Sequence, residues 1–235
     1  MMLYTSARII AAYSVHFFTA LGALLAFTAL ISFTQLDFQQ GFLWLMAGLC
    51  VDGIDGTLAR RLEVATFARN LNGKYLDLVV DYVNFVFVPA VFFYYYPGLP
   101  EKFRWIIISI VLFAGTYNFG LKNDTTDDGY FLGCPAAWHF LAFYIFIFQW
   151  PPWINMAIIL GFAALHFIPI KVVYLTRYRP YPQVTWALLL LWAGLAISLL
   201  LRPNLRDLLL LPFSISSLYF VALSIKRTFV KQARC

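Results

Sequence analysis

The chain has 235 residues, of which 62% are hydrophobic and 12% are charged. About a quarter of the residues in soluble domains are charged, so this composition excludes an ordinary soluble domain and indicates an integral membrane protein. The formal net charge is +6, but the basic residues are scattered over short segments between apolar stretches. This distribution argues against a nucleic-acid-binding protein.

Apolar stretches recur along the whole chain, and about 20 residues of this kind cross a bilayer as a helix. We therefore predict an all-α polytopic membrane protein, with a single domain over 1–235 that contains eight transmembrane helices. Their predicted ranges are 8–33, 40–61, 74–96, 104–122, 134–150, 153–175, 183–201 and 207–226. The first stretch begins near a basic residue, as a signal peptide does. Its apolar run of about 25 residues is too long for one, so we expect it to be retained.

The basic residues are distributed unevenly over the predicted connections. If the N-terminus is cytoplasmic, thirteen of the 17 Lys and Arg residues lie on the cytoplasmic side. The positive-inside rule then predicts that both termini and the connection between the second and third spans are cytoplasmic. In a bacterium this describes a multi-pass protein of the inner membrane. Cys50, Cys134 and Cys235 show no spacing typical of a metal site or of a disulfide framework.

Four aspartates lie near the cytoplasmic ends of the second and third predicted spans. Asp52 and Asp55 are three residues apart, and Asp77 and Asp81 are four apart, so each pair lies on one face of its helix. A carboxylate in a bilayer costs about 2.5–3.5 kcal/mol on insertion scales, and intramembrane acids are usually functional. Two facing acidic pairs make an oxygen-rich site that suits a divalent cation such as Mg²⁺ or Mn²⁺. The alternative is a structural ion-pair network with neighbouring basic residues.

The residues around these acids suit the cleavage of a pyrophosphate by an alcohol. Two cations about 3.5–4 Å apart can hold the attacking and leaving oxygens, and a carboxylate can accept the hydroxyl proton. Gly53, Gly56 and Ala59 leave room for a nucleotide beside the second span. Arg60 can bind a phosphate oxygen by two parallel hydrogen bonds, or it can serve only as a topogenic charge.

Two polar residues of the first span are further candidates. Thr19 can help to bind the nucleotide, or it can bond to its own helix backbone. His16 can face the site, or it can be a buried structural histidine. Between the second and third spans, residues 61–72 are predicted to form a short interfacial helix.

This part of the chain resembles the motif of the CDP-alcohol phosphotransferase superfamily, D-x2-D-G-x2-A-R-x8-G-x3-D-x3-D. The matching residues are Asp52, Asp55, Gly56, Ala59, Arg60, Gly73, Asp77 and Asp81. Twelve residues separate Arg60 from Gly73 where the general motif has eight, a difference of about one helical turn. This longer spacing and the segments 11–16, 76–83, 133–138 and 167–174 resemble the bacterial phosphatidylcholine synthase branch.

The resemblance implies a reaction and a role for each motif residue. CDP-diacylglycerol would transfer its phosphatidyl group to choline, which gives phosphatidylcholine and CMP, with two Mn²⁺ or Mg²⁺ ions per site. Asp52, Asp55 and Asp77 would be metal ligands, and Asp81 would be the general base and could also contact a metal. The residues expected to bind CDP-diacylglycerol are Gly56, Ala59, Arg60 and Gly73 from the resemblance, together with Gly53 and Thr19. Partners implied are membrane lipids and, as among relatives, a second copy of the chain in a homodimer.

Choline carries a quaternary ammonium group, which aromatic faces bind in proteins. The chain has 24 Phe, 14 Tyr and 7 Trp residues, so candidates are numerous. We predict Tyr82 first because it adjoins Asp81, followed by Tyr75 and by Trp138 at the start of the fifth span.

Three alternatives compete with this assignment. A related enzyme of the same superfamily could use another acceptor, such as serine, inositol, glycerol phosphate or a second phospholipid. A divalent-cation transporter would place acids near the bilayer midplane in two related halves, whereas these acids cluster beside one connection. A non-catalytic membrane scaffold does not account for the motif.

Overall fold

Helices make up nearly all of the fold in the computed structural model, which describes residues 2–121, 130–168, 171–173 and 182–230. The longer helices are α1 (Met2–Thr34), α2 (Phe38–Arg61), α4 (Gly73–Tyr82), α5 (Val88–Tyr95), α6 (Arg104–Phe119), α7 (Trp138–Phe148), α8 (Pro152–Leu165), α9 (Pro182–Leu201) and α10 (Arg206–Val230). The short elements are α3 (Val64–Phe67), the π-helix η1 (Val83–Phe87), the 3-10 helices η2 (Glu101–Phe103) and η3 (Pro203–Leu205), and the strands β1 (Tyr130–Leu132) and β2 (Lys171–Val173).

Within the described ranges, five helical segments are long and apolar enough to cross a membrane, so the prediction of an all-α multi-pass membrane protein is confirmed. They are 6–34, 38–61, 73–95, 182–201 and 203–224. The third of them is continuous through α4, η1 and α5. Every one of the eight predicted spans coincides with a helix. However, α6, α7 and α8 have only 16, 11 and 14 residues, so the number of crossings stays a prediction.

The predicted span 153–175 is wrong in its second half. Helix α8 ends at Leu165, and β2 pairs instead with β1 in a two-stranded antiparallel sheet. A proline at position 169 disfavours helical conformation in the residue before it and cannot donate a helical hydrogen bond. The valines at 172 and 173 are β-branched and suit a strand. Hydropathy alone therefore overstated the length of this helix.

The predicted spans 104–122 and 134–150 are also shorter in the structure. Helix α6 ends at Phe119, where Gly120 caps it. Helix α7 begins at Trp138 and ends before Gln149, whose φ of 51° lies in the left-handed region. Because Pro135 lacks an N–H group and restricts its predecessor, the chain preceding Trp138 does not continue the helix.

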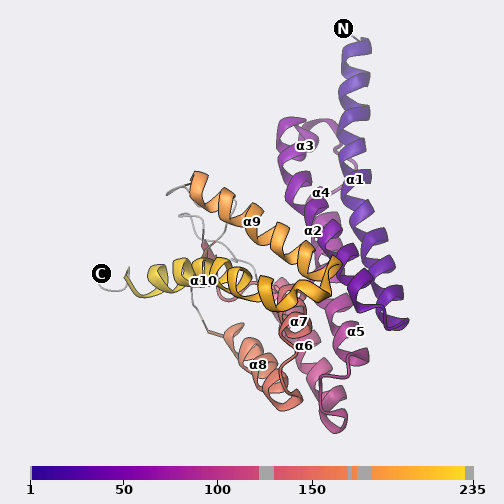
Figure 1. The fold of residues 1–235 in the computed structure, drawn as a ribbon. Helices are drawn as coiled ribbons and strands as arrows, with labels where there is room; N and C mark the ends of the chain where they lie inside the picture. Colours follow the sequence, from indigo (N-terminus) through magenta and orange to yellow (C-terminus); the bar gives the residue numbers. More distant parts are fainter. Residues whose placement is uncertain (1, 122–129, 169–170, 174–181, 231–235) are drawn as a thin grey trace.

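The N-terminal helices pack along one another, whereas the C-terminal helices cross them. Figure 1 shows α1, α2, α4 and α5 running together, with α3 toward one end and the α5–α6 connection toward the other. Helices α9 and α10 lie side by side and run across this direction, over α7. The acids of α2 and α4 are therefore held within the bundle that α1 completes.

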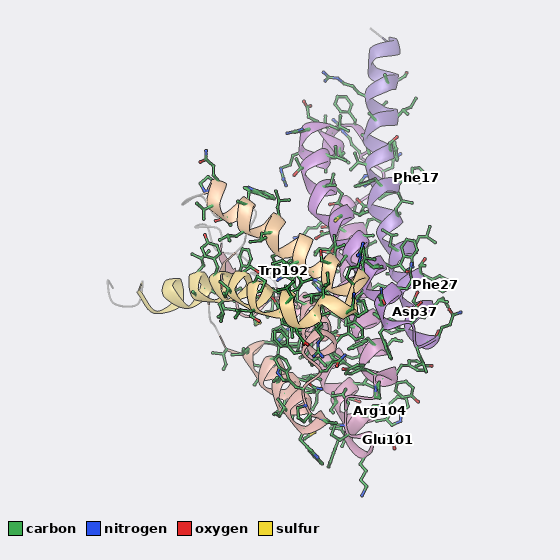
Figure 2. All side chains as sticks on the ribbon, in the orientation of Figure 1. Phe17, Phe27, Asp37, Glu101, Arg104 and Trp192 are labelled. Carbon is green, nitrogen blue, oxygen red and sulfur yellow. The ribbon has the colours of Figure 1, made fainter. Side chains whose placement is uncertain are left out.

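Aromatic rings fill the core of this bundle. Phe42 of α2 lies 5.2 Å from Phe33 of α1 and 4.9 Å from Phe92 of α5, measured between ring centroids, both edge to face. Such contacts add to the free energy of burial. In contrast, Figure 2 shows Phe17 and Phe27 projecting outward from α1, where 76% and 60% of their surface is exposed. Exposed rings of this size suit a lipid environment.

Polar contacts join the C-terminal helices to α7. The guanidinium group of Arg206 donates to the carbonyl oxygens of Ile147 and Phe148, each at 3.0 Å, and so satisfies the last turn of α7. The indole N–H of Trp192, labelled in Figure 2, donates to the hydroxyl oxygen of Tyr144 at 3.0 Å. These bonds hold α9 and α10 to α7, which in turn packs against η1.

Candidate active site

The acids are brought together because the chain reverses between α2 and α4. Glu63, with a φ of 50°, turns the chain out of α2 and into α3. The side-chain oxygen of Asn72 then accepts hydrogen bonds from the backbone N–H groups of Lys74 at 3.2 Å and Tyr75 at 3.4 Å, and so caps α4. The twelve residues at 61–72 therefore form a separate turn with a short helix, as predicted, while its position at the membrane interface stays a prediction.

Asp52, Asp55 and Asp77 form one cluster. Each offers a carboxylate oxygen, and these three oxygens lie within 4.8 Å of one another. Asp55 is buried and the other two are partly exposed. Three carboxylates this close repel one another unless a cation lies between them, and carboxylate oxygens are the ligands that Mg²⁺ and Mn²⁺ prefer. The donor set therefore fits a divalent metal ion.

Thr19 holds one of these carboxylates. Its hydroxyl group donates to Oδ2 of Asp55 at 2.7 Å, and both side chains are buried. The same hydroxyl lies 3.3 Å from the backbone carbonyl oxygen of Val15. The backbone bond considered for Thr19 is therefore present, but its shorter contact is with a predicted metal ligand, and nucleotide binding by Thr19 stays a prediction. A threonine in this position orients the carboxylate from α1.

Asp81 lies on the same face of α4 as Asp77, one turn later. It is not among the three acids whose oxygens converge within 4.8 Å, although its carboxyl group is near enough to interact electrostatically with all three. The fourth acid is thus set slightly apart from the cluster. The role of Asp81 as general base stays a prediction.

The glycines near the acids lie in two different environments. A Cβ atom added at Gly53 would meet no heavy atom within 4 Å, and one at Gly56 would meet only Arg60 Nη1 at 3.5 Å. A Cβ atom at Gly73 would lie 2.8 Å from Cε1 of His16. Gly53 and Gly56 therefore border open space, whereas Gly73 allows α4 to approach α1 at His16.

Ala59 and Arg60, at the end of α2, point in different directions. Ala59 packs against a small apolar cluster that contains Ala12 and Val15 of α1. Arg60 is exposed, and its guanidinium group donates to the hydroxyl oxygen of Thr57 at 3.2 Å. The side chain of Arg60 is therefore available at the open side of Gly56.

The three aromatic residues predicted to bind choline lie in separate surroundings. The hydroxyl group of Tyr82 is 3.1 Å from that of Thr116 on α6, and its ring is 5.7 Å from Phe119. Tyr75 is 68% exposed. Trp138 is fully buried against α8, where its ring stacks on His166 at 5.1 Å. These three residues do not form one aromatic cage.

A polar junction that the sequence analysis did not single out lies directly below the acids. The side-chain amide of Asn84 donates to the carbonyl oxygens of Gly22 on α1 at 3.1 Å and of Val80 at 3.0 Å. On α2, Gly48 leaves space for the other side of this amide, since a Cβ atom there would lie 2.7 Å from Asn84 Oδ1. The sequence contains a signal for this junction, because an asparagine lies inside an apolar run and glycines lie on the neighbouring spans.

This fold and this site define a class. The chain is a multi-pass membrane protein with a carboxylate cluster suited to divalent metal between its second and third helical segments, beside an open, glycine-lined surface.

Comparison with known proteins identifies the family. The family model for CDP-alcohol phosphatidyltransferases matches residues 5–168, so the chain belongs to that family and the resemblance predicted from the motif is confirmed. A phosphatidylcholine synthase of Pseudomonas aeruginosa is 37% identical over 220 residues, 92% of each chain. One of Bradyrhizobium diazoefficiens is 36% identical over 80% of this chain and 70% of its own, and one of Borreliella burgdorferi is 32% identical over 76% of each.

Proposed function

We propose that the chain is a phosphatidylcholine synthase, which transfers the phosphatidyl group of CDP-diacylglycerol to choline and releases CMP. The observation that carries this proposal is the convergence of Asp52, Asp55 and Asp77 within 4.8 Å beside the open surface at Gly53 and Gly56. A cluster of this kind suits a pyrophosphate held through divalent cations. The relatives named phosphatidylcholine synthase support choline as the acceptor.

The reaction is a displacement at the phosphorus atom that carries the diacylglycerol. The hydroxyl oxygen of choline forms a new bond to this phosphorus, and the bond from the phosphorus to the oxygen of CMP breaks. Asp81 accepts the hydroxyl proton, and CMP leaves with the electron pair of the broken bond. Asp52, Asp55 and Asp77 would hold Mn²⁺ or Mg²⁺, two ions per site, and this positive charge would neutralise the pyrophosphate and the leaving oxygen.

The roles of the surrounding residues follow from their positions. Asp52, Asp55 and Asp77 bind metal, and Thr19 keeps Asp55 oriented. The nucleotide lies along the open surface of α2 at Gly53 and Gly56. Arg60, exposed at the edge of that surface, pairs with a phosphate oxygen.

Ala59 and Gly73, also predicted to bind the headgroup, contribute to the site through helix packing. Ala59 packs against α1, and Gly73 gives His16 room at the start of α4. A side chain larger than methyl at position 59, or any side chain at position 73, would press against α1. We propose that both act on CDP-diacylglycerol binding through this helix packing.

Location and assembly complete the proposal. The excess of basic residues supports a cytoplasmic position for both termini and for the acidic site, at a bacterial inner membrane, on the side where CMP and choline are dissolved. A homodimer is the assembly that the family resemblance implies. Its mass in lipid nanodiscs would distinguish one copy from two.

The experiment that tests the function is CMP release by the purified protein. CDP-diacylglycerol and Mn²⁺ are supplied with choline, with serine, with glycerol phosphate or with no alcohol. We expect release with choline, abolished in Asp81→Asn. Asp37→Asn is the matched control, because Asp37 caps α2 at its far end and an asparagine caps a helix equally well. Release with serine and not with choline would identify serine as the acceptor and would group the chain with the related serine enzymes.

A further inference from the structure

A buried histidine packs against the helical segment that carries the proposed base. His139, in the first turn of α7, is 8% exposed, and neither of its ring nitrogens has a hydrogen-bond partner among the residues that the structure describes. Leaving a buried polar group unpaired costs about 1–3 kcal/mol. Its ring instead contacts two phenylalanine rings, Phe140 at 4.1 Å and Phe85 at 4.4 Å between centroids.

Phe85 connects this histidine to Asp81. It lies four residues after Asp81, close to one turn of this helix, so the two side chains project from a similar side of it. Phe85 belongs to η1, and π-turns of this kind occur frequently at functional sites. It is half-buried, and the interplanar angle between its ring and that of His139 is 32°. The two rings therefore pack against each other at η1, and the partly exposed ring of Phe85 lies about one turn of helix from Asp81.

The one-turn spacing of Asp81 and Phe85 suits a small amino alcohol whose hydroxyl group lies at Asp81. In choline, two methylene groups separate the hydroxyl oxygen from the quaternary nitrogen, a distance shorter than one helical turn of about 5.4 Å. With the oxygen near Asp81, the methylated nitrogen lies between the levels of Asp81 and Phe85 along the helix. A cation is attracted to an aromatic ring within about 6 Å of its centroid.

We propose that Phe85 and His139 form the subsite for the quaternary ammonium group of the acceptor, one helical turn below Asp81. This inference rests on the proposed function and replaces Tyr82, Tyr75 and Trp138 as the residues that select the acceptor. Tyr82 points elsewhere because its hydroxyl group is bonded to Thr116 of α6. A pair of rings accepts methylated nitrogen, whereas a primary ammonium loses hydrogen bonds with water that the rings do not replace.

The test measures acceptor kinetics in purified variants. Phe85→Leu removes the aromatic face at similar volume, and Phe85→Tyr keeps it. Phe87→Leu is the matched control, since Phe87 lies in the same π-turn and is 42% exposed on the outer surface. We expect Phe85→Leu to raise the KM for choline about tenfold while the KM for CDP-diacylglycerol changes less than twofold. Phe85→Tyr and Phe87→Leu should stay within twofold of the unchanged protein for both substrates.

His139→Leu provides an independent second variant. It should also raise the KM for choline selectively, and the rate with ethanolamine relative to choline should rise in both leucine variants. Equal changes in both KM values, or no change for choline in either leucine variant, would overturn the subsite. Failure of the proposed function looks different, because the unchanged protein would then release CMP with another alcohol or with none.

Discussion

At the scale of single residues, the site depends on how each carboxylate is held. Asp55 is buried and accepts a hydrogen bond of 2.7 Å from Thr19 on a different helix. Bonds from a neutral donor to a charged acceptor contribute about 1.5–3 kcal/mol, more than most hydrogen bonds in proteins. Thr19 therefore links the position of α1 to the geometry of the metal ligands, and its effect should appear in catalysis.

Replacing Thr19 by valine tests this link. Valine has the same shape but donates no hydrogen bond, so Asp55 is free to rotate. We expect kcat/KM for CMP release to fall about tenfold, the equivalent of about 1.4 kcal/mol. Thr28→Val is the matched control, because the Thr28 hydroxyl donates to the carbonyl oxygen of Leu24 within its own helix. Equal losses in the two variants would mean that Thr19 contributes only to the helix.

Metal dependence tests the three-carboxylate cluster itself. Asp77→Asn keeps an oxygen ligand but removes its negative charge, so each bound cation is held less tightly. We expect the Mn²⁺ concentration for half-maximal CMP release to rise at least about tenfold, a typical effect of disturbing a metal site. A chelator should abolish release by the unchanged protein, and added Mn²⁺ should restore it. Full activity in the presence of excess chelator would contradict a metal site here.

At the scale of helices, the junction at Asn84 sets how deeply α4 packs against its neighbours. Asn84 contacts α1 at Gly22 and lies against α2 at Gly48. Each contact is about one helical turn from a residue of the site, since Gly22 follows Thr19 by three positions and Gly48 precedes Asp52 by four. Because the amide bonds to the backbone of α1 and occupies the space above Gly48, a shift at this point would move the acids relative to one another.

A double-mutant cycle tests this junction. Gly48→Ala places a methyl group 2.7 Å from Asn84 Oδ1, and overpacking of this kind costs about 1–3 kcal/mol. In an Asn84→Ser background the smaller side chain leaves room, so the same alanine should cost much less. Thermal unfolding in detergent and CMP release are measured for all four proteins. Gly194→Ala, where an added Cβ atom meets nothing within 4 Å, is the control. Purely additive effects would show that the two positions are independent.

Local spacing predicted some of these elements well and others poorly. The acids of each pair were correctly placed on one face because positions three or four apart coincide on any helix. Tyr82 shows the limit of the same rule. It adjoins Asp81 in sequence, but adjacent residues of a helix point in different directions, and Tyr82 faces Thr116 instead. Which neighbour a face meets depends on tertiary packing, which one sequence does not reveal.

At the scale of the whole molecule, the arrangement of the helices bears on its orientation in the membrane. The α2–α4 connection and the α5–α6 connection lie at opposite ends of the N-terminal bundle in Figure 1, and Figure 2 places Glu101 at the second of these ends. If the bundle crosses the bilayer, these connections lie on opposite sides of it. The bias of Lys and Arg assigns the first to the cytoplasm.

Labelling of single cysteines tests this orientation. The native cysteines are replaced by serine, and one cysteine is introduced at Asn70 or at Glu101, both exposed and neither of them basic, so the charge bias is preserved. In spheroplasts, a membrane-impermeant maleimide should label Glu101→Cys and leave Asn70→Cys unlabelled. In inside-out vesicles the result should reverse, and both should react in detergent. The opposite pattern would place the acidic site outside the cell, away from cytoplasmic nucleotide. Labelling of both cysteines in spheroplasts would mean that the helical segment 73–95, which joins the two connections, does not span the bilayer.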